Sequence, residues 1–222
     1  MSLLHTTYTI LRKDIKSEMR NRYVINSLLM FVVVTISIIR FSLGDEKVEN
    51  DILSGLLWIV IFFSAISGLA RIFIKEEEKE TSASLKLNCP PVSIFLGKLF
   101  FNFILTLSLN LFIVILFVLI TELQIANFTA FVLTIFFGNL GLVSASTIIA
   151  AIIAKANTKG TLYPVLAFPV LLPLLITVIN ATKLSCAGAD TMSLMAEFQI
   201  LISYAIVVTT VSLLLFKFVW ED

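Results

Sequence analysis

Residues 99–120 read LFFNFILTLSLNLFIVILFVLI, and this stretch contains no charged side chain. A helix needs about 20 mostly apolar residues to cross the hydrocarbon core of a membrane. The polar side chains in the stretch are asparagine, serine and threonine, which hydrogen bonds between helices satisfy. The stretch therefore predicts a membrane-spanning helix.

Five further runs of similar character lie on either side of it. They cover residues 24–43, 52–74, 128–154, 162–179 and 198–219. Across the 222 residues, 59% are hydrophobic and 14% are charged, against about 25% charged in a soluble domain. The sequence therefore predicts a single all-α membrane domain over residues 1–222, with six transmembrane helices and no separate soluble domain.

The basic residues indicate how these helices are oriented. All of the 16 lysines and arginines except Arg40, Lys47 and Lys183 fall in the N-terminal segment, the second and fourth connections and the C-terminal region. Basic residues are enriched in cytoplasmic segments, so we expect both termini in the cytoplasm. These residues adjoin the apolar runs and form no separate basic face, which gives no support for nucleic-acid binding.

The first 22 residues predict a helix that lies along the membrane surface. Apolar side chains recur there at steps of four, three, four and four, while the basic side chains lie elsewhere on the helix. The apolar positions are Leu4, Tyr8, Leu11, Ile15 and Met19. Either a simple anchor on anionic lipid or a surface for docking a partner is consistent with this pattern.

The second connection reads KEEEKETSASLKLNCPPVSIFLGK from Lys75 to Lys98. Its acidic residues do not help orientation, so they are either a solvated helical turn or part of a docking element. In the second interpretation, Thr81 or Ser82 caps a short helix that ends before Pro90 and Pro91. The residues assigned to docking are Glu76, Glu77, Glu80, Leu85 and Leu87.

The fourth and fifth runs differ in the residues that shape a helix. The fourth is rich in small residues that allow close helix approach, which predicts a helix at the centre of the bundle. These are Gly138, Gly141, Ser144, Ala145, Ser146 and Thr147. The fifth contains Pro164, Pro169 and Pro173, so we expect it to be kinked, either as a fixed bend or as a moving gate.

The sequence lacks the motifs of common membrane enzymes and ATPases. It contains no phosphate-binding Walker loop, no His-Glu-x-x-His, no Gly-x-Ser-x-Gly and no pair of acids inside a span. The single histidine, His5, is expected to be a surface residue, and we expect this chain itself to bind no metal or cofactor. Cys89 and Cys186 are expected in connections on opposite sides of the membrane, so no disulfide is predicted.

Two segments resemble the haem exporter protein B family, CcmB. The stretch KGTLYPVLAFPVLLPLLI at residues 159–176 is similar to that family's glycine followed by a Leu-Pro-x-x-x-Pro-Leu-Leu-Ile run, with Phe168 replacing the leucine. The second connection is similar in its Arg-x-Phe, its acidic pair and its proline-rich approach to a lysine, but Thr81 to Ser84 depart from the family's pattern. The matching residues are Gly160, Pro169, Pro173, Arg71, Phe73, Glu76, Glu77, Glu80, Pro90 and Lys98.

The resemblance implies an ABC-2-type permease subunit in the inner membrane that serves haem export and cytochrome c maturation. It implies a cytoplasmic ABC ATPase that binds the ATP, a haem-handling membrane protein, an extracytoplasmic haem chaperone and two copies of this chain in the complex. Haem is then a possible cargo of the complex and not a ligand of this chain, and ATP hydrolysis by the partner drives either haem delivery or release of the haem-loaded chaperone. Gly160 and the three prolines are expected to form a gating helix. The alternative is an ABC-2 exporter for a drug, lipid or polysaccharide.

Overall fold

The computed structural model describes residues 3–20, 22–44, 48–69, 71–78, 81–155 and 162–221. In this part of the chain all the regular structure is helical, which confirms the predicted fold class. The helices are α1 (Leu3–Arg20), α2 (Tyr23–Leu43), α3 (Asn50–Leu69), α4 (Arg71–Glu78), α5 (Ser82–Asn88), α6 (Pro91–Thr121), α7 (Phe128–Lys155), α8 (Leu162–Cys186) and α9 (Met195–Glu221).

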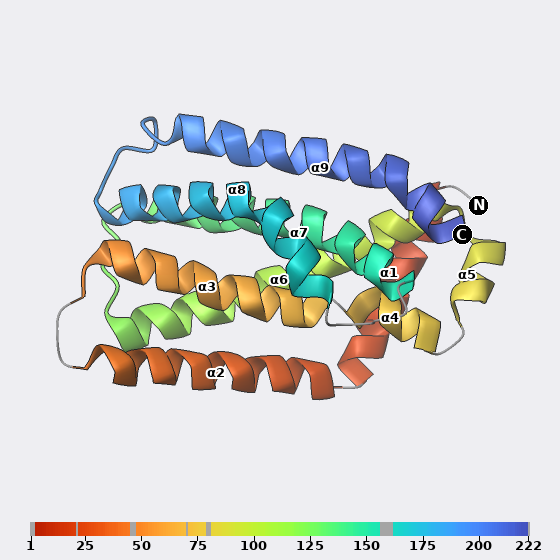
Figure 1. Cartoon of the computed structure of the whole chain (residues 1–222), viewed down its shortest axis with the longest axis horizontal. Coiled ribbons are helices and arrows are strands. Elements are labelled where there is room, and N and C mark those ends of the chain that lie inside the picture. Colours follow the sequence, from red (N-terminus) through yellow and green to blue (C-terminus); the bar gives the residue numbers. More distant parts are fainter. Residues whose placement is uncertain are drawn as a thin grey trace.

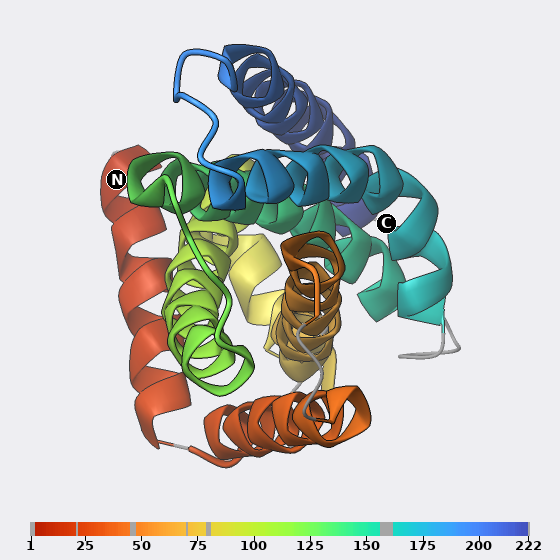
Figure 2. The same ribbon diagram turned by 90° about the vertical axis from the view of Figure 1, so that its left-hand side faces the viewer.

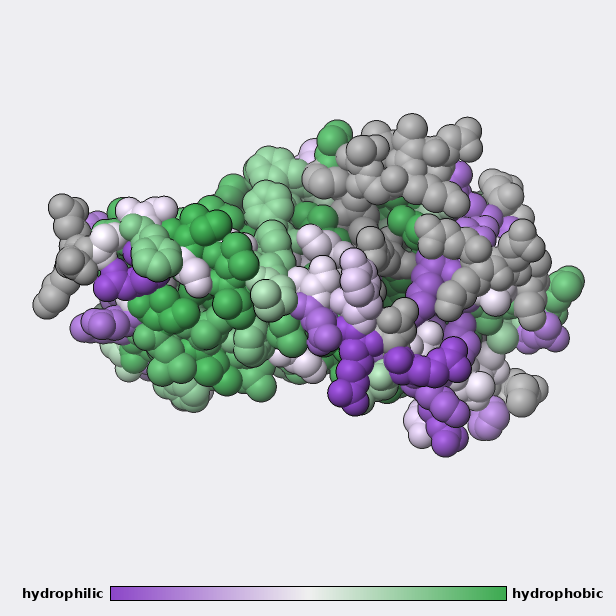
Figure 3. Space-filling model, turned by 90° about the horizontal axis from the view of Figure 1, so that it is seen from below, coloured by the Kyte–Doolittle hydropathy of each residue, from purple (hydrophilic) through white to green (hydrophobic). Residues whose placement is uncertain are grey.

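Six long helices lie side by side and alternate in direction along the chain (Figure 1). Both termini lie at one end of this bundle, together with α1, α4 and α5. Six candidate membrane spans are found among the described residues, as predicted. Hydrophobic residues form a broad band on the face seen in Figure 3, and hydrophilic residues gather toward the end that carries the termini.

Three of the predicted spans have different bounds in the structure. The second is longer than predicted, because the candidate span runs from Asn50 to Glu77 and includes α3 and nearly all of α4. The third begins at Pro91 instead of residue 99, because proline is well suited to the first position of a helix. The fifth continues to Cys186, because contacts with α3 satisfy its polar end: Trp58 Nε1 donates to Thr182 Oγ1 at 2.8 Å.

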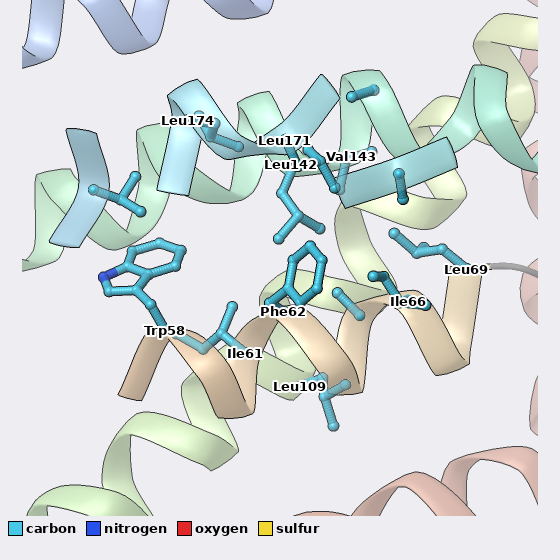
Figure 4. Close-up of a cluster of buried hydrophobic side chains, with 14 of the residues drawn as sticks. Trp58, Ile61, Phe62, Ile66, Leu69, Leu109, Leu142, Val143, Leu171 and Leu174 are labelled. Carbon is cyan, nitrogen blue, oxygen red and sulfur yellow. The ribbon is translucent and has the colours of Figure 1, made fainter. Parts of the chain in front are cut away.

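Helix α7 is the most deeply buried of the spans, as its small residues predicted. It packs against α8 and α9 on one side and against α6, α3 and α4 elsewhere. Figure 4 shows the part of the core in which Trp58, Ile61 and Phe62 of α3 face Leu142 of α7 and Leu171 and Leu174 of α8. The bundle is therefore organised around α7.

Gly138 of α7 permits the close packing of α3 and α8. A Cβ atom there would lie 2.4 Å from Trp58 Cη2 and 2.9 Å from Val178 Cγ1. We expect Gly138→Ala to destabilise the protein by about 1–3 kcal/mol, because overpacking outweighs the better helix propensity of alanine.

The matched control is Gly55→Ala in α3, where an added Cβ has no atom within 4 Å. Denaturant unfolding of the purified variants in detergent measures both effects. Equal stability of the two variants would contradict this packing.

Helix α8 is bent but continuous. Pro169 and Pro173 lie inside it, and its N-terminal part turns away from the direction of the remainder (Figure 1). Each proline removes a backbone donor from the helix and crowds the preceding turn, which explains the bend. The predicted kink is confirmed. Pro164 falls in the first turn of α8, but its side chain lies outside the described residues, as does the whole of Gly160.

Helix α1 runs across the bundle at the end with the termini and is seen lengthwise in red at the left of Figure 2. It packs against α6 through a face that is more polar than the predicted apolar stripe. The buried residues of that face are Thr6, Thr7, Ile10 and Asp14. Leu4, Tyr8 and Met19 of the stripe are 78%, 61% and 58% exposed.

The two cysteines lie at opposite ends of the bundle and are both free. Cys89 follows α5, as expected for a connection. The assignment of Cys186 to a connection is wrong, because it is the last residue of α8 and is buried. Labelling of Cys186 is therefore an unsuitable measure of which side of the membrane that end faces.

Candidate functional site: a buried charge cluster at the end that carries the termini

Four charged side chains from three helices meet at the end of the bundle with the termini. Lys98 Nζ of α6 lies 2.7 Å from Glu76 Oε1 of α4 and 3.1 Å from Asp14 Oδ2 of α1. Lys13 Nζ lies 2.6 Å from the same Glu76 oxygen and 3.4 Å from Asp14 Oδ1. We call these four residues the charge cluster. It joins α1, α4 and α6.

The centre of the charge cluster is shielded from solvent. The Lys98 side chain is 1% exposed, and those of Asp14 and Glu76 are 9% exposed. Lys98 Nζ also donates to the carbonyl oxygen of Ile72 at 3.4 Å and lies 5.7 Å from the centroid of the Phe73 ring. A buried charge persists only when it is paired and hydrogen-bonded, so these contacts depend on one another.

Lys13 lies at the more open side of the cluster, with its side chain 44% exposed. Partial burial disfavours its charged form, but Asp14 and Glu76 outweigh that effect and raise the pKa of Lys13 above its ordinary value. The lysine therefore stays charged at physiological pH.

Two further ion pairs hold α4 to its neighbours. Lys75 Nζ lies 3.2 Å from Glu18 Oε2 of α1, and Lys155 Nζ of α7 lies 3.3 Å from Glu77 Oε1. These side chains are more exposed than Lys98, so removing one partner from either pair is expected to cost less than removing Lys98. Together with the charge cluster they connect α4 to α1, α6 and α7.

The same end contains a cluster of aromatic side chains. Phe216 of α9 stacks on Trp220 at 5.5 Å between ring centroids and lies 5.1 Å from Phe95 of α6. Phe73 of α4 contacts both Phe216 and Trp220 at 5.6 and 5.8 Å. Such ring pairs add to the apolar burial, so α4 and α9 are fixed to each other as well as to α6.

Helix α5 lies at the outer edge of this end (Figure 1). Leu85 packs against the core, whereas Leu87 is 86% exposed. The short helix predicted to carry these two leucines is confirmed. The predicted side-chain cap is wrong, because Thr81 donates to the Glu76 carboxylate and Ser82 to that of Glu77.

The model of the CcmB protein family matches residues 5–219. The chain belongs to the CcmB family. No protein with a curated description matches it. As a CcmB-family protein, the chain is a multi-pass membrane subunit of a haem-exporter ABC transporter in cytochrome c biogenesis, a complex that includes an ATPase partner.

The structure brings together residues that the CcmB resemblance singled out separately. Phe73 and Glu76 of α4 both contact Lys98, although Lys98 lies 22 positions after Glu76 in the sequence. Glu76 is therefore directed into the protein and is buried, which does not fit an exposed docking carboxylate. Glu77 is half-buried and pairs with Lys155. Glu80 lies outside the described residues.

Sequence reasoning missed Lys13 and Asp14 as members of this CcmB site. The signal that points to Asp14 is a second stripe on the N-terminal helix, in which Thr6 or Thr7, Ile10 and Asp14 follow one another at helical spacing. Gly97 of α6 lies beneath this stripe, and a Cβ there would lie 2.8 Å from Ile10 Cγ2. The close approach of α1 and α6 therefore encloses Asp14 and Lys98.

The described residues offer no group of three or more histidine, cysteine, aspartate or glutamate side chains that would hold a metal ion. His5 lies on the exposed side of α1, at the end with the termini. That the chain binds no haem or metal of its own stays a prediction.

Proposed function

We propose that the chain is the permease subunit that transmits the work of a cytoplasmic ATPase to haem delivery or to release of a haem-loaded chaperone. The charge cluster is the observation that carries this proposal. It makes α1, α4 and the start of α6 one rigid unit, and α5 projects from that unit with Leu87 exposed. A rigid unit with an exposed apolar contact is suited to receive a push from a partner.

In this proposal the protein lies in the inner membrane. The end of the bundle that carries the termini faces the cytoplasm. The distribution of lysines and arginines supports that orientation. The ATPase contacts α5 through Leu87, with Leu85 fixing the helix to the core and Glu76 and Glu77 positioning α4 behind it. Glu80 belongs to the same docking segment by its position in the sequence.

The movement would reach the external side through α7 and α8. Helix α4 packs against α7, and α7 packs extensively against α8, which contains Pro169 and Pro173. Packed helices with two arrangements transmit such coupling. Gly160 and Pro164 lie at or before the start of the bent helix in the sequence and complete the proposed gate.

For the remaining partners we propose those that the CcmB resemblance implies. Two copies of the chain act with the ATPase, and a haem-handling membrane protein holds the haem and passes it to an extracytoplasmic chaperone. Haem iron is usually held by histidine, methionine, cysteine or tyrosine. Since the only histidine is His5, at the end proposed to be cytoplasmic, this chain does not hold the haem by histidine ligation.

A complementation assay tests this function. Cells that lack their own CcmB protein are supplied with the wild-type chain or with a variant, and their mature cytochrome c is compared. We expect Pro169→Ala/Pro173→Ala to reduce mature cytochrome c by about 2- to 30-fold, which corresponds to a loss of about 0.5–2 kcal/mol of coupling. The reason is that alanine restores the missing helix donors and straightens α8. Haem staining measures cytochrome c, and membrane fractionation shows that the variant is inserted.

Two controls accompany this experiment. Leu172→Ala changes an exposed residue of the same helix without adding a donor, and His5→Ala removes the histidine. Both are expected to leave cytochrome c unchanged. Normal production with the double proline variant would refute the gating role, and loss of production with His5→Ala would refute the assignment of haem to the partner.

A further inference from the structure

A groove opens between α1, α2 and α6, next to the charge cluster. Its volume is about 280 Å³. Residues 15–19 of α1, 25–29 of α2 and 101–109 of α6 contribute to its walls. The apolar side chains that define it include Met19, Leu28, Leu29, Phe101, Ile104 and Leu105.

The walls of the groove offer almost no hydrogen bonds to a ligand. Ser108 and Glu18 are the polar residues that line it. Ser108 Oγ donates to the carbonyl oxygen of Ile104 at 2.8 Å. Glu18 pairs with Lys75 through Oε2, and its Oε1 is buried, with no hydrogen-bond partner in the described part of the chain. A polar molecule would lose its hydration there without compensation, so the groove suits an alkyl chain.

The groove also lies at the depth of a lipid chain. Helix α6 rises about 1.5 Å per residue, so residues 101–109 lie roughly 5–16 Å beyond Lys98 along the helix, toward the middle of the span. On the near side, the groove reaches α1, which runs across the end of the bundle (Figure 2). It thus runs from the level of the surface helix into the apolar part of the membrane.

Two arginines lie close in the sequence to residues that line the groove. Arg20 follows the lining residue Met19, and Arg22 stands just before α2, whose residue Ile25 also lines the groove. Both arginines are exposed, and no acidic partner for either is found in the part of the chain that the structure describes. By contrast, the acids of α1, Asp14 and Glu18, are paired with Lys98 and Lys75. The local charge is therefore complementary to a phosphate group.

We propose that this groove binds one acyl chain of an anionic phospholipid, whose phosphate contacts Arg20 and Arg22. A bound lipid would fill the space between α1 and the bundle and help to hold α1 across its end. The orientation proposed above determines only which leaflet of the membrane supplies the lipid. Binding itself is independent of the ATPase and of haem.

Photo-crosslinking tests this proposal. The full chain is placed in vesicles that contain phosphatidylglycerol with a diazirine in one acyl chain. After photolysis, we expect adducts concentrated on the peptides of α2 and α6 that line the groove. Ile104→Trp, which fills the groove, should reduce these adducts at least tenfold. Ile115→Trp, a similarly exposed position of the same helix outside the groove, should leave them unchanged.

The headgroup contact is tested with phosphatidylcholine that carries the same diazirine-labelled acyl chain. The wild-type chain should be labelled several-fold more by the anionic lipid, and Arg20→Gln/Arg22→Gln should remove this preference. Lys217→Gln, an exposed basic residue of α9, should preserve it. Even labelling of all apolar surfaces, or an Ile104→Trp variant labelled like wild type, would overturn the proposal. In the complete complex, cross-links from the groove to a partner protein in place of lipid would also overturn it.

Discussion

Lys98→Met is expected to destabilise the protein by about 3–5 kcal/mol, because it leaves buried carboxylates with too little positive charge. Asp14 would lose its 3.1 Å contact with Lys98, and Glu76 would keep only the partly exposed Lys13 as a cationic partner. The methionine has a similar length, so the effect reports charge and not a cavity. Denaturant unfolding in detergent and the amount of protein in the membrane measure the result.

The control for this prediction is Lys183→Met at the opposite end of the bundle. Lys183 Nζ lies 3.3 Å from Asp51, but the two side chains are 36% and 63% exposed. An exposed pair is typically worth no more than about 1 kcal/mol, so this variant should stay close to wild type. Equal effects of the two lysine substitutions would contradict the importance of the buried cluster.

A neutral version of the cluster separates its charge from its shape. In Asp14→Asn/Glu76→Gln/Lys98→Met the buried groups carry no charge, and the remaining Lys13 is partly exposed to solvent. Replacement of a buried ion pair by neutral groups of similar size is often tolerated. We therefore expect the triple variant to recover most of the stability that Lys98→Met loses.

Much of the architecture was predictable from hydropathy and small-residue patterns. The uncharged run at residues 99–120 and its five counterparts predicted the spans, and the glycines of α7 predicted its central place. The start of α6 at Pro91 was missed because Lys98 interrupts the apolar run there. In the structure Lys98 is part of α6, and its side chain can be buried because Glu76 and Asp14 balance its charge.

The meeting of the four side chains of the charge cluster was beyond the reach of sequence patterns. Lys13 and Glu76 are 63 positions apart, and nothing in a single sequence indicates that these two side chains meet. An acidic run is typical of a solvated surface, and the burial of Glu76 depends on how α4 packs against α7 and meets α1 and α6. As a result, charge reversal of Glu76 would disturb the fold and is a poor test of docking.

Leu87 offers a cleaner test of docking. It is 86% exposed, so its replacement removes little contact within the chain itself. If it enters a pocket of the ATPase, Leu87→Asp should cost about 2 kcal/mol or more of binding free energy, which corresponds to about 30-fold weaker association. Met192→Asp is the matched control, because Met192 is 73% exposed at the opposite end of the bundle.

The measurement that tests the central claim most directly is the ratio of ATPase to permease after purification of the complex through a tag on this chain. Leu87→Asp should lower that ratio severely while the permease remains folded in the membrane, and Met192→Asp should leave it at the wild-type value. A normal ratio with Leu87→Asp, or loss of the ATPase with Met192→Asp alone, would contradict the assignment of α5 and its end of the bundle to ATPase docking.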